Sequence, residues 1–469
     1  MYNKLVWVLL EKVGVTIINF VALIVMSRLL TPDDYGVYGT MILFIAITET
    51  LIDSGFGGAL VQKKNIAHFD INTLFFFNIL ISLVSYVLLF VTAPFIEDFY
   101  SIHNLALYFR VLGITLILYA ISILQVSLFN RNLDFKKSAI INLSSYLLAA
   151  IIAVAMAYYG YGVWALILQL LLSSLFLALF YWMLNPISIK FELSKESFNY
   201  LWKFGINTVG ANILQTLVNN IATSIIPKIG SSSQSGLYFQ ANRVSNLPTS
   251  ILTQCIDKGV FPILSKEASE VQIISKARSL NRIILSLIIP LFPILSLISY
   301  PVVMIILGKN WIGAVEYLSI LSWSGIALTI QSLYRNIIKS TGKTQFIFIV
   351  EVFKSLLTIL ALFISMRYGV LFLVYTFTVS SYLGVIIWGI VLSRHFNYSF
   401  KQQIFDFIKP TAVILLIILV FSICNIKCNN YYSLILAPVL YLLYWMISVL
   451  LFKNEDLLNL TKQLIIKFS

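Results

Sequence analysis

Apolar residues occur along the chain in long runs that are separated by short polar segments. A helix that crosses a lipid bilayer needs roughly 20 mainly apolar residues, because each residue adds about 1.5 Å to its length. Read against that length, the pattern predicts about 14 transmembrane helices. They lie at residues 5–27, 36–56, 71–93, 104–128, 138–159, 162–184, 203–226, 236–262, 283–307, 312–336, 346–366, 369–393, 410–425 and 431–452.

The segments between these runs are short. None exceeds roughly twenty residues, which leaves no room for a folded soluble domain. The composition agrees, since 59% of the 469 residues are hydrophobic and only 11% are charged, whereas about a quarter are charged in soluble domains. The sequence therefore predicts an all-α polytopic membrane protein that acts inside the bilayer.

The basic residues predict the orientation of the chain. The formal charge is +13, but Lys and Arg are spread over alternate loops and form no stripe that would bind nucleic acid. With a cytoplasmic N-terminus, most of them fall on one side, including Lys63, Lys136, Arg278 and Lys401. Because basic loops stay on the cytoplasmic side, we expect both termini in the cytoplasm.

Cysteine and histidine give no sign of a metal or cofactor. The three cysteines have no CxxC spacing and the three histidines lie far apart in loops, so neither a disulfide framework nor a metal site is predicted. No cofactor is expected. These residues are Cys255, Cys424, Cys428, His68, His103 and His395.

Two pairs of short motifs indicate an internal repeat. "EKVGVTIINF" at Glu11 is echoed by "WKFGINTVGA" at Trp202, and "DYGVYG" at Asp34 by "QSGLYF" at Gln234. Six predicted helices lie between the two starts, so both copies have the same orientation in the membrane. We therefore predict an N-lobe of six helices at residues 1–185, a C-lobe of six at 186–395, and two C-terminal helices at 396–469.

Arg28 and Arg243 are candidates because they lie at the end of or within predicted spans, where charge is costly and often marks a substrate pathway. Arg28 closes the first span, and Arg243 lies about two turns into the eighth, in "YFQANRVSNLP". Either side chain can alternatively extend to the membrane surface, although Arg243 is less well placed to do so. Pro248 follows Arg243 by about one turn and favours a bend there.

Glu49 and Asp53 lie four residues apart, so both carboxyl groups project from one face of the second helix. Carboxylates this close repel each other, which favours uptake of a proton and makes them candidates for ion coupling. The alternative is a hydrated helix end. Six other charged residues are secondary candidates, of which Glu351 and Lys354 can pair within one helix. The six are Lys12, Lys203, Asp257, Lys258, Glu351 and Lys354.

The stretches "SRLLTPDDYGVYG", "GFGGALVQKKN", "LFNRNLDFKK" and "YRNIIKSTGKTQ" resemble the Wzx-type flippases of the polysaccharide transporter family, which belongs to the multidrug/oligosaccharidyl-lipid/polysaccharide (MOP) superfamily. "YFQANRVSNLP" also resembles the eighth helix of the related lipid II flippases. Tyr238, Ala241, Arg243 and Pro248 match that pattern, as does Leu247. The acidic residue of the pattern is replaced here by asparagine, at position 242.

The resemblance implies a fold and a function. The fold has two six-helix lobes facing a central cavity, followed by two C-terminal helices. The function is transfer of an undecaprenyl-diphosphate-linked oligosaccharide, such as an O-antigen or exopolysaccharide unit, across the bacterial inner membrane for lipopolysaccharide or polysaccharide biosynthesis. Arg28 and Arg243 would bind the diphosphate. H⁺ or Na⁺ would be the coupling ion, and the polymerase and chain-length regulator of the same pathway would be partners.

Other classes of membrane protein are less compatible with the sequence. A cation-coupled small-molecule exporter of the same superfamily would have an acidic, aromatic cavity rather than arginines. A membrane glycan polymerase or glycosyltransferase would have a long outer loop with catalytic residues, whereas "IEDFYSIHN" is among the longest outer loops here. A structural scaffold would not need a buried arginine. We therefore predict a transporter and not an enzyme.

Overall fold

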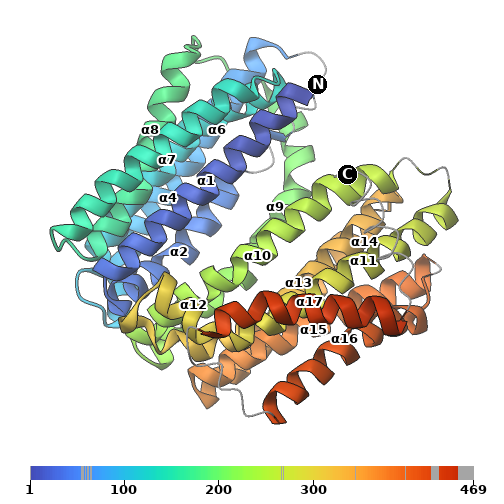
Figure 1. Ribbon diagram of the computed structural model, residues 1–469. Helices are drawn as coiled ribbons and strands as arrows, with labels where there is room; N and C mark the ends of the chain where they lie inside the picture. Colours follow the sequence, from blue (N-terminus) through green and yellow to red (C-terminus); the bar gives the residue numbers. More distant parts are fainter. Residues whose placement is uncertain are drawn as a thin grey trace. The chain divides into compact units, whose positions relative to one another are not determined.

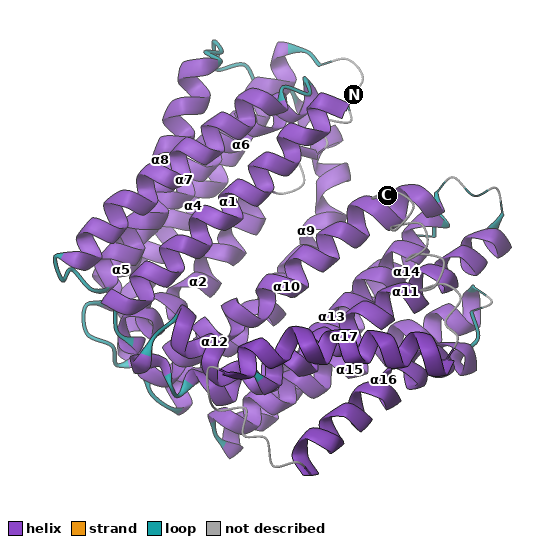
Figure 2. Ribbon diagram, viewed as in Figure 1, coloured by secondary structure: helices purple, strands orange, loops and turns teal. Residues whose placement is uncertain are grey.

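The computed structural model describes residues 2–53, 57–58, 60, 63, 66–265, 267, 269–343, 345–396, 398–423 and 432–452. Within them, it describes side chains except those of residues 2–5, 200–208, 211, 418–423, 432–436 and 449–452. Every regular element in this part of the chain is a helix (Figures 1 and 2). The predicted all-α fold class is thus confirmed.

The helices follow one another with short connections. The first part of the chain forms α1 (Tyr2–Leu29), α2 (Pro32–Asp53), α4 (His68–Tyr100), α5 (Leu105–Leu112), α6 (Ile114–Arg131), α7 (Phe135–Tyr158), α8 (Val163–Leu184), α9 (Lys195–Ile229) and α10 (Ser232–Leu264). The rest forms α11 (Glu270–Leu297), α12 (Ser299–Ile306), η1 (Lys309–Trp311), α13 (Ala314–Ser340), α14 (Gln345–Ser365), η2 (Met366–Tyr368), α15 (Val370–His395), α16 (Phe400–Ile423) and α17 (Tyr432–Phe452).

Within the described residues, nine segments are long and apolar enough to cross a membrane by length and composition. The chain is therefore a multi-pass membrane protein, while the number of 14 spans stays a prediction. Helices α9 and α10 are not among the nine. Both carry rows of Asn, Gln and Ser side chains, which lower their hydropathy and would be costly against lipid.

Two predicted spans are each divided into two helices. The span predicted at 104–128 consists of α5 and α6, which meet at Gly113, and the span predicted at 283–307 consists of α11 and α12, which meet at Ile298. The second division has a local cause. Pro301 lies in the first turn of α12, where its missing N–H costs little and where a helix readily begins.

Helices α2 and α10 begin with the same reciprocal cap. The Thr31 N–H donates to Asp34 Oδ2 (2.9 Å), and the Asp34 N–H donates to Thr31 Oγ1 (3.3 Å). In α10, the Ser231 N–H donates to Gln234 Oε1 (3.2 Å), and the Gln234 N–H donates to Ser231 Oγ (3.2 Å). Each pair satisfies two backbone donors that the helix leaves free. The cap therefore repeats at the two positions where the sequence motifs repeat.

The two helix starts also contact each other reciprocally through glycine. A Cβ atom added to Gly36 would lie 1.8 Å from the carbonyl oxygen of Ser232, and one added to Gly236 would lie 1.8 Å from the carbonyl oxygen of Pro32. Only glycine permits so close a backbone approach. Gly36 and Gly236 are equivalent in the repeat, and so are Pro32 and Ser232. Each glycine contacts the residue that precedes the other glycine by four positions, so the contact has local twofold symmetry. This symmetry supports the internal repeat.

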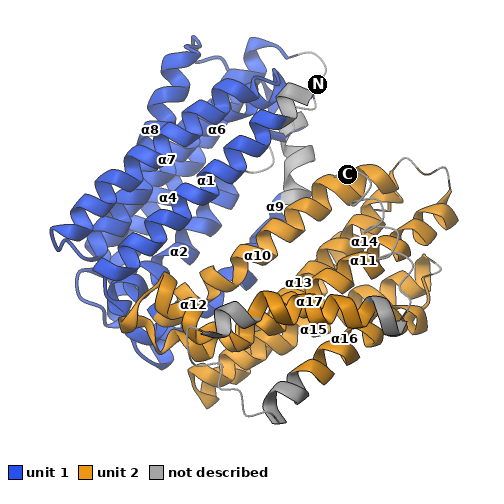
Figure 3. Ribbon diagram, viewed as in Figure 1, with its two compact units in different colours: residues 1–236 blue, residues 237–469 orange. Residues whose placement is uncertain are grey.

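The structure divides into two compact units, Met1–Gly236 and Leu237–Ser469 (Figure 3). Helix α9 falls into the first unit because it packs against α2 and α4. This division follows packing, whereas the lobes predicted at residues 1–185, 186–395 and 396–469 follow the sequence repeat. The division of the chain into lobes that repeat each other therefore stays a prediction.

The first unit is built around helices α2, α5, α6 and α8, with α1 packed on α7 and α7 packed on α8. One apolar cluster of this unit includes Met41, Phe109, Leu116 and Ile167, all buried. Phe44 meets Phe109 edge to face, with ring centroids 5.3 Å apart, an arrangement that aromatic pairs favour. This cluster packs against one face of α2, and the opposite face of α2 contacts α9.

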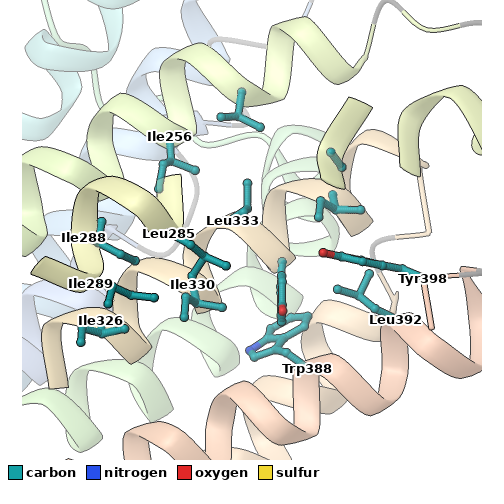
Figure 4. Close-up of a cluster of buried hydrophobic side chains, with 14 of the residues drawn as sticks. Ile256, Leu285, Ile288, Ile289, Ile326, Ile330, Leu333, Trp388, Leu392 and Tyr398 are labelled. Atoms are coloured by element: carbon teal, nitrogen blue, oxygen red, sulfur yellow. The ribbon is translucent and has the colours of Figure 1, made fainter. Parts of the chain in front are cut away.

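The second unit has its core among α10, α11, α13 and α15 (Figure 4). Leu285 and Ile330 lie in this cluster, and Trp388 and Tyr398 are fully buried at its edge. Within a bilayer such side chains are held together by van der Waals packing, because lipid tails are as apolar as the side chains themselves. The core fixes α10 through its apolar side and leaves its polar side for other contacts.

A polar network attaches α16 to this core. Arg278 donates to both carboxylate oxygens of Asp406, at 3.0 and 3.3 Å, and the Tyr398 hydroxyl donates to the same carboxylate at 3.3 Å. Asn281 donates to Tyr398 Oη at 2.9 Å. Burial raises the pKa of the Tyr398 phenol, so it remains protonated and able to donate. The network provides hydrogen-bond partners for the buried carboxylate of Asp406, whose charge would otherwise be costly to bury.

Candidate functional site

Arg243 lies on a polar face of α10, 11 residues after Ser232 and so roughly 16 Å from the start of the helix. Its side chain is half-buried. Asn242 and Asn246 lie beside it, and Asn246 Nδ2 donates to Asn242 Oδ1 at 2.9 Å. Within the described part of the chain, the Arg243 guanidinium makes no hydrogen bond or ion pair. It is therefore free to bind an anion.

The opposite side of this stretch of α10 is packed. Tyr238 and Ala241 are fully buried, and Tyr238 meets Tyr317 with ring centroids 6.4 Å apart. The helix continues through Pro248. The two sides of the motif "YFQANRVSNLP" thus differ in role, because the tyrosine and alanine fix the helix while the asparagines and the arginine form its polar face.

Arg28 lies in the last turn of α1, and its side chain is exposed. A basic residue at a helix C-terminus is favoured by the helix dipole. Arg28 belongs to the first unit and Arg243 to the second. Their joint action on one ligand stays a proposal.

Glu49 and Asp53 line a cavity of about 390 Å³ between α2 and α9 in the first unit. Thr50 lies between them, and its hydroxyl is 3.2 Å from that of Thr216 on α9. Tyr119 of α6 also lines the cavity. Both carboxyl groups therefore project from one face of α2, as their spacing predicts, and that face borders a polar cavity rather than the core.

Five polar residues of α9 complete the lining of this cavity. They are spaced i, i+3, i+4, i+7 and i+8, which places them on one face of the helix. None of them is among the residues predicted from the sequence, although their spacing along the helix was a signal that could have indicated them. The five are Asn212, Gln215, Thr216, Asn219 and Asn220.

A second cavity, of about 470 Å³, adjoins the first, because Asp53 and Tyr119 line both. Its wall includes Asn130 and Asn142. Asn142 Nδ2 lies 3.2 Å from Glu11 Oε1 of α1, so this cavity also has a carboxylate nearby. Sequence reasoning missed Glu11 and Asn142, since 131 residues separate them and no local pattern connects them.

Three secondary candidates of the second unit, Asp257, Glu351 and Lys354, are paired with neighbouring side chains. Asp257 of α10 accepts hydrogen bonds from Ser332 Oγ (3.0 Å) and Asn336 Nδ2 (2.5 Å) of α13. Glu351 and Lys354 form an ion pair at 2.5 Å within α14. These groups stabilise helix contacts, because each charge is matched by a partner that the fold supplies.

Other charged groups add to this picture. Arg335 approaches Glu351 at 4.0 Å, and Lys354 Nζ donates to Gln331 Oε1 at 3.1 Å. Lys258 and Lys12 are exposed. The side chain of Lys203 lies outside the described residues. Among the described residues, no group of three or more His, Cys, Asp or Glu side chains is placed to hold a metal ion.

Comparison with known proteins gives the family. The model of a family described as polysaccharide biosynthesis protein matches residues 25–316, more than half of the chain, and the chain belongs to this family. The succinoglycan biosynthesis transport protein ExoT of Rhizobium meliloti is 24% identical over 73% of this chain and 69% of its own length. The teichuronic acid biosynthesis protein TuaB of Bacillus subtilis is 22% identical over 87% and 85%.

A solved structure gives the fold. The inward closed conformation of the lipid II flippase MurJ superposes with a TM-score of 0.78, covering 96% of this chain and 99% of that chain at 14% sequence identity. At that identity the likeness shows a shared fold. The polysaccharide family recognised from sequence motifs is confirmed by the family match, and the fold that the resemblance implies is confirmed by the likeness to MurJ.

Proposed function

We propose that this protein is a flippase that moves an undecaprenyl-diphosphate-linked oligosaccharide from the inner to the outer leaflet of the bacterial cytoplasmic membrane. One observation carries the proposal: a half-buried arginine, Arg243, lies on a polar helix face with no partner among the described residues. Membership of the polysaccharide biosynthesis family and the MurJ-like fold support it.

The chemistry of the substrate explains why an arginine is needed. A diphosphate must cross about 30 Å of hydrocarbon, where an unpaired charge is very costly. A guanidinium offers two parallel N–H donors that match phosphate oxygens, and it stays charged in surroundings of low polarity. Arg243, with Arg28 as second ligand, neutralises the diphosphate. The lipid chain stays in the bilayer while the glycan occupies polar cavities.

In this proposal transport follows alternating access, as in transporters built from two related halves. Both chain termini face the cytoplasm, because the basic loops then lie on the inner side. The exported unit passes to a polymerase and a chain-length regulator, which take the lipid-linked oligosaccharide on the outer face. The family match and the relatives' names favour this role over that of a small-molecule exporter.

Removal of the protein from a bacterium that makes it is the test of the function. We expect the cell-surface glycan to disappear and the lipid-linked oligosaccharide to accumulate, accessible only from the cytoplasmic side. Sensitivity to cationic drugs should not change. Normal glycan display together with increased drug sensitivity would favour the small-molecule exporter.

Glu49 and Asp53 are the proposed coupling residues, with H⁺ or Na⁺ as the ion. They face a polar cavity on α2, where a carboxyl group can exchange a cation with water. We expect Glu49→Gln and Asp53→Asn to slow transport driven by an ion gradient tenfold or more, because the neutral side chain cannot carry the ion.

Transport in vesicles under imposed H⁺ or Na⁺ gradients measures this coupling. Glu267→Gln is the matched control, since Glu267 forms a surface ion pair with Lys276 and surface pairs contribute little. The coupling role is excluded when both carboxyl variants respond to the gradients as the unmodified protein does.

A further inference from the structure

The α2–α9 cavity is not explained by binding of a diphosphate. Among the described side chains, its lining contains two carboxyl groups, Glu49 and Asp53, and no lysine or arginine. Phosphate oxygens would meet like charge there, which is unfavourable at short range. The lining is mainly polar, so a lipid chain would leave its amides and carboxyl groups without hydrogen bonds.

The row of amides on α9 fits a different chemistry. The side chains of Asn212, Gln215 and Asn219 make no hydrogen bond within the described part of the chain. Asn220 uses one N–H on the carbonyl oxygen of Thr216, at 2.9 Å, which leaves its own carbonyl oxygen available. Each amide presents both a donor and an acceptor. Together they offer a line of alternating donors and acceptors along one helix face.

The opposite wall supplies acceptors. Glu49 and Asp53 are one turn apart on α2, and a carboxyl group can accept a hydrogen bond whether or not it is protonated. The hydroxyls of Thr50 and Thr216 lie 3.2 Å apart and connect the two walls. Tyr119 adds an aromatic ring. The vicinal hydroxyl groups of a sugar pair with donors and acceptors placed side by side, and the apolar face of the sugar ring packs against an aromatic ring. The cavity offers both.

The size of the cavity agrees with such a ligand. Its volume of about 390 Å³ lies within the roughly 300–1,000 Å³ of small-molecule sites. The adjoining cavity of about 470 Å³ shares Asp53 and Tyr119 with it, and its mainly apolar wall includes the amides of Asn130 and Asn142. More than one sugar residue can therefore be accommodated along the two cavities.

The position of the cavity separates it from Arg28. Glu49 lies 17 residues into α2, about 25 Å from the helix start that follows Arg28. A ligand that contacts both Arg28 and the α2–α9 cavity must be long. It must be anionic at the end near Arg28 and rich in hydroxyl groups at the end in the cavity. A lipid-linked oligosaccharide has this form.

We propose that the α2–α9 cavity is a glycan subsite, in which the amides of α9 and the carboxyl groups of α2 bind the hydroxyl groups of a neutral or amino sugar. The proposal rests on the proposed function as a flippase, and it adds where the sugar binds and of what class it is. Acidic sugars such as uronic acids are disfavoured here, since their carboxylates would approach Glu49 and Asp53.

Binding to the purified full-length protein tests the subsite with two probes. One is a farnesyl-diphosphate-linked disaccharide of neutral sugars, and the other is bare farnesyl diphosphate. The double variant Gln215→Ala with Asn219→Ala should bind the glycan probe about tenfold more weakly, because two hydrogen bonds are lost, and should bind bare farnesyl diphosphate as the unmodified protein does.

Four further variants make the result specific. Gln272→Ala truncates an exposed amide of α11 outside the cavity and should leave both affinities unchanged. Arg243→Ala should weaken binding of both probes. The single variants Asn212→Ala and Asn219→Ala, at exposed positions of α9, should each give part of the effect without lowering the melting temperature.

The outcomes distinguish failure of the glycan subsite from failure of the proposed flippase function. Equal affinity of the double variant and the unmodified protein for the glycan probe overturns the subsite, and so does an equal loss for both probes. The flippase proposal survives either result as long as Arg243→Ala weakens both probes. If the unmodified protein binds neither probe, the proposed function fails, and the subsite with it.

Discussion

Arg243→Ala is expected to abolish display of the surface glycan while the protein still accumulates in the membrane. Arg243 has no partner among the described residues, so its removal leaves no buried charge unpaired and should not unfold the protein. A bidentate arginine makes two charge-assisted hydrogen bonds of about 1.5–3 kcal/mol each. Since each 1.4 kcal/mol is a factor of ten, affinity for a lipid diphosphate should fall by at least about a hundredfold.

Two further variants show whether the effect belongs to the guanidinium. Arg243→Lys keeps the charge but loses the bidentate geometry, so it should restore only part of the glycan. Arg367→Ala is the matched control, since Arg367 is an exposed arginine in η2, and it should behave as the unmodified protein. Quantitative staining of surface glycan, with immunoblotting of membranes, measures both. Full glycan display by Arg243→Ala would remove Arg243 from the transport site.

Gly36→Ala and Gly236→Ala are expected to destabilise the protein and stop transport. In each variant the new Cβ would lie 1.8 Å from a backbone carbonyl oxygen, whereas real Cβ atoms stay beyond 3.0 Å. A carbonyl of a helix start cannot rotate away as a flexible side chain can, so the starts of α2 and α10 must separate. Overpacking of this kind costs about 1–3 kcal/mol, and the change falls on a contact that occurs twice by local symmetry.

Thermal unfolding in detergent, followed by transport in vesicles, measures this effect. Gly259→Ala is the matched control within α10, because nothing lies within 4 Å of its added Cβ. Alanine is also favoured over glycine inside a helix by up to about 1 kcal/mol, so this variant should be as stable as the unmodified protein or slightly more stable. A melting temperature of Gly36→Ala equal to that of Gly259→Ala would show that the contact is not tight.

The sequence was informative where local patterns decide the structure. Each predicted span overlaps a helix or a pair of helices, because a run of apolar residues in lipid has little alternative to a helix. The spacing of Glu49 and Asp53 correctly placed both on one face of α2. The pairing of Glu351 with Lys354 follows from their separation by three residues.

The sequence was less informative where distant elements meet. The spacing of the α9 amides defines a face, but nothing local indicates that α2 lies opposite. Asp257 is only a secondary candidate in the sequence, and nothing local indicates that it accepts hydrogen bonds from Ser332 and Asn336 of α13. The ninth span contains Pro290, Pro293 and Pro301, and nothing in the sequence indicates that the helix divides only near the third of them, at Ile298.

The internal repeat shows how the two kinds of information combine. "DYGVYG" and "QSGLYF" are too short to establish a repeat by themselves. The structure adds the same reciprocal cap at Thr31–Asp34 and Ser231–Gln234. It also adds the reciprocal glycine contact. Evolution from a duplicated unit explains why a cap and a close contact recur at equivalent positions.

Transfer of a fluorescent undecaprenyl-diphosphate-linked oligosaccharide across the membrane of vesicles containing the purified protein tests the central claim most directly. The unmodified protein should make the label accessible to an external quencher far faster than protein-free vesicles do, and vesicles with Arg243→Ala should match the protein-free rate. Equal rates for the unmodified protein and for protein-free vesicles, in the presence of H⁺ and of Na⁺ gradients, would contradict the claim that this protein is a flippase of lipid-linked glycan.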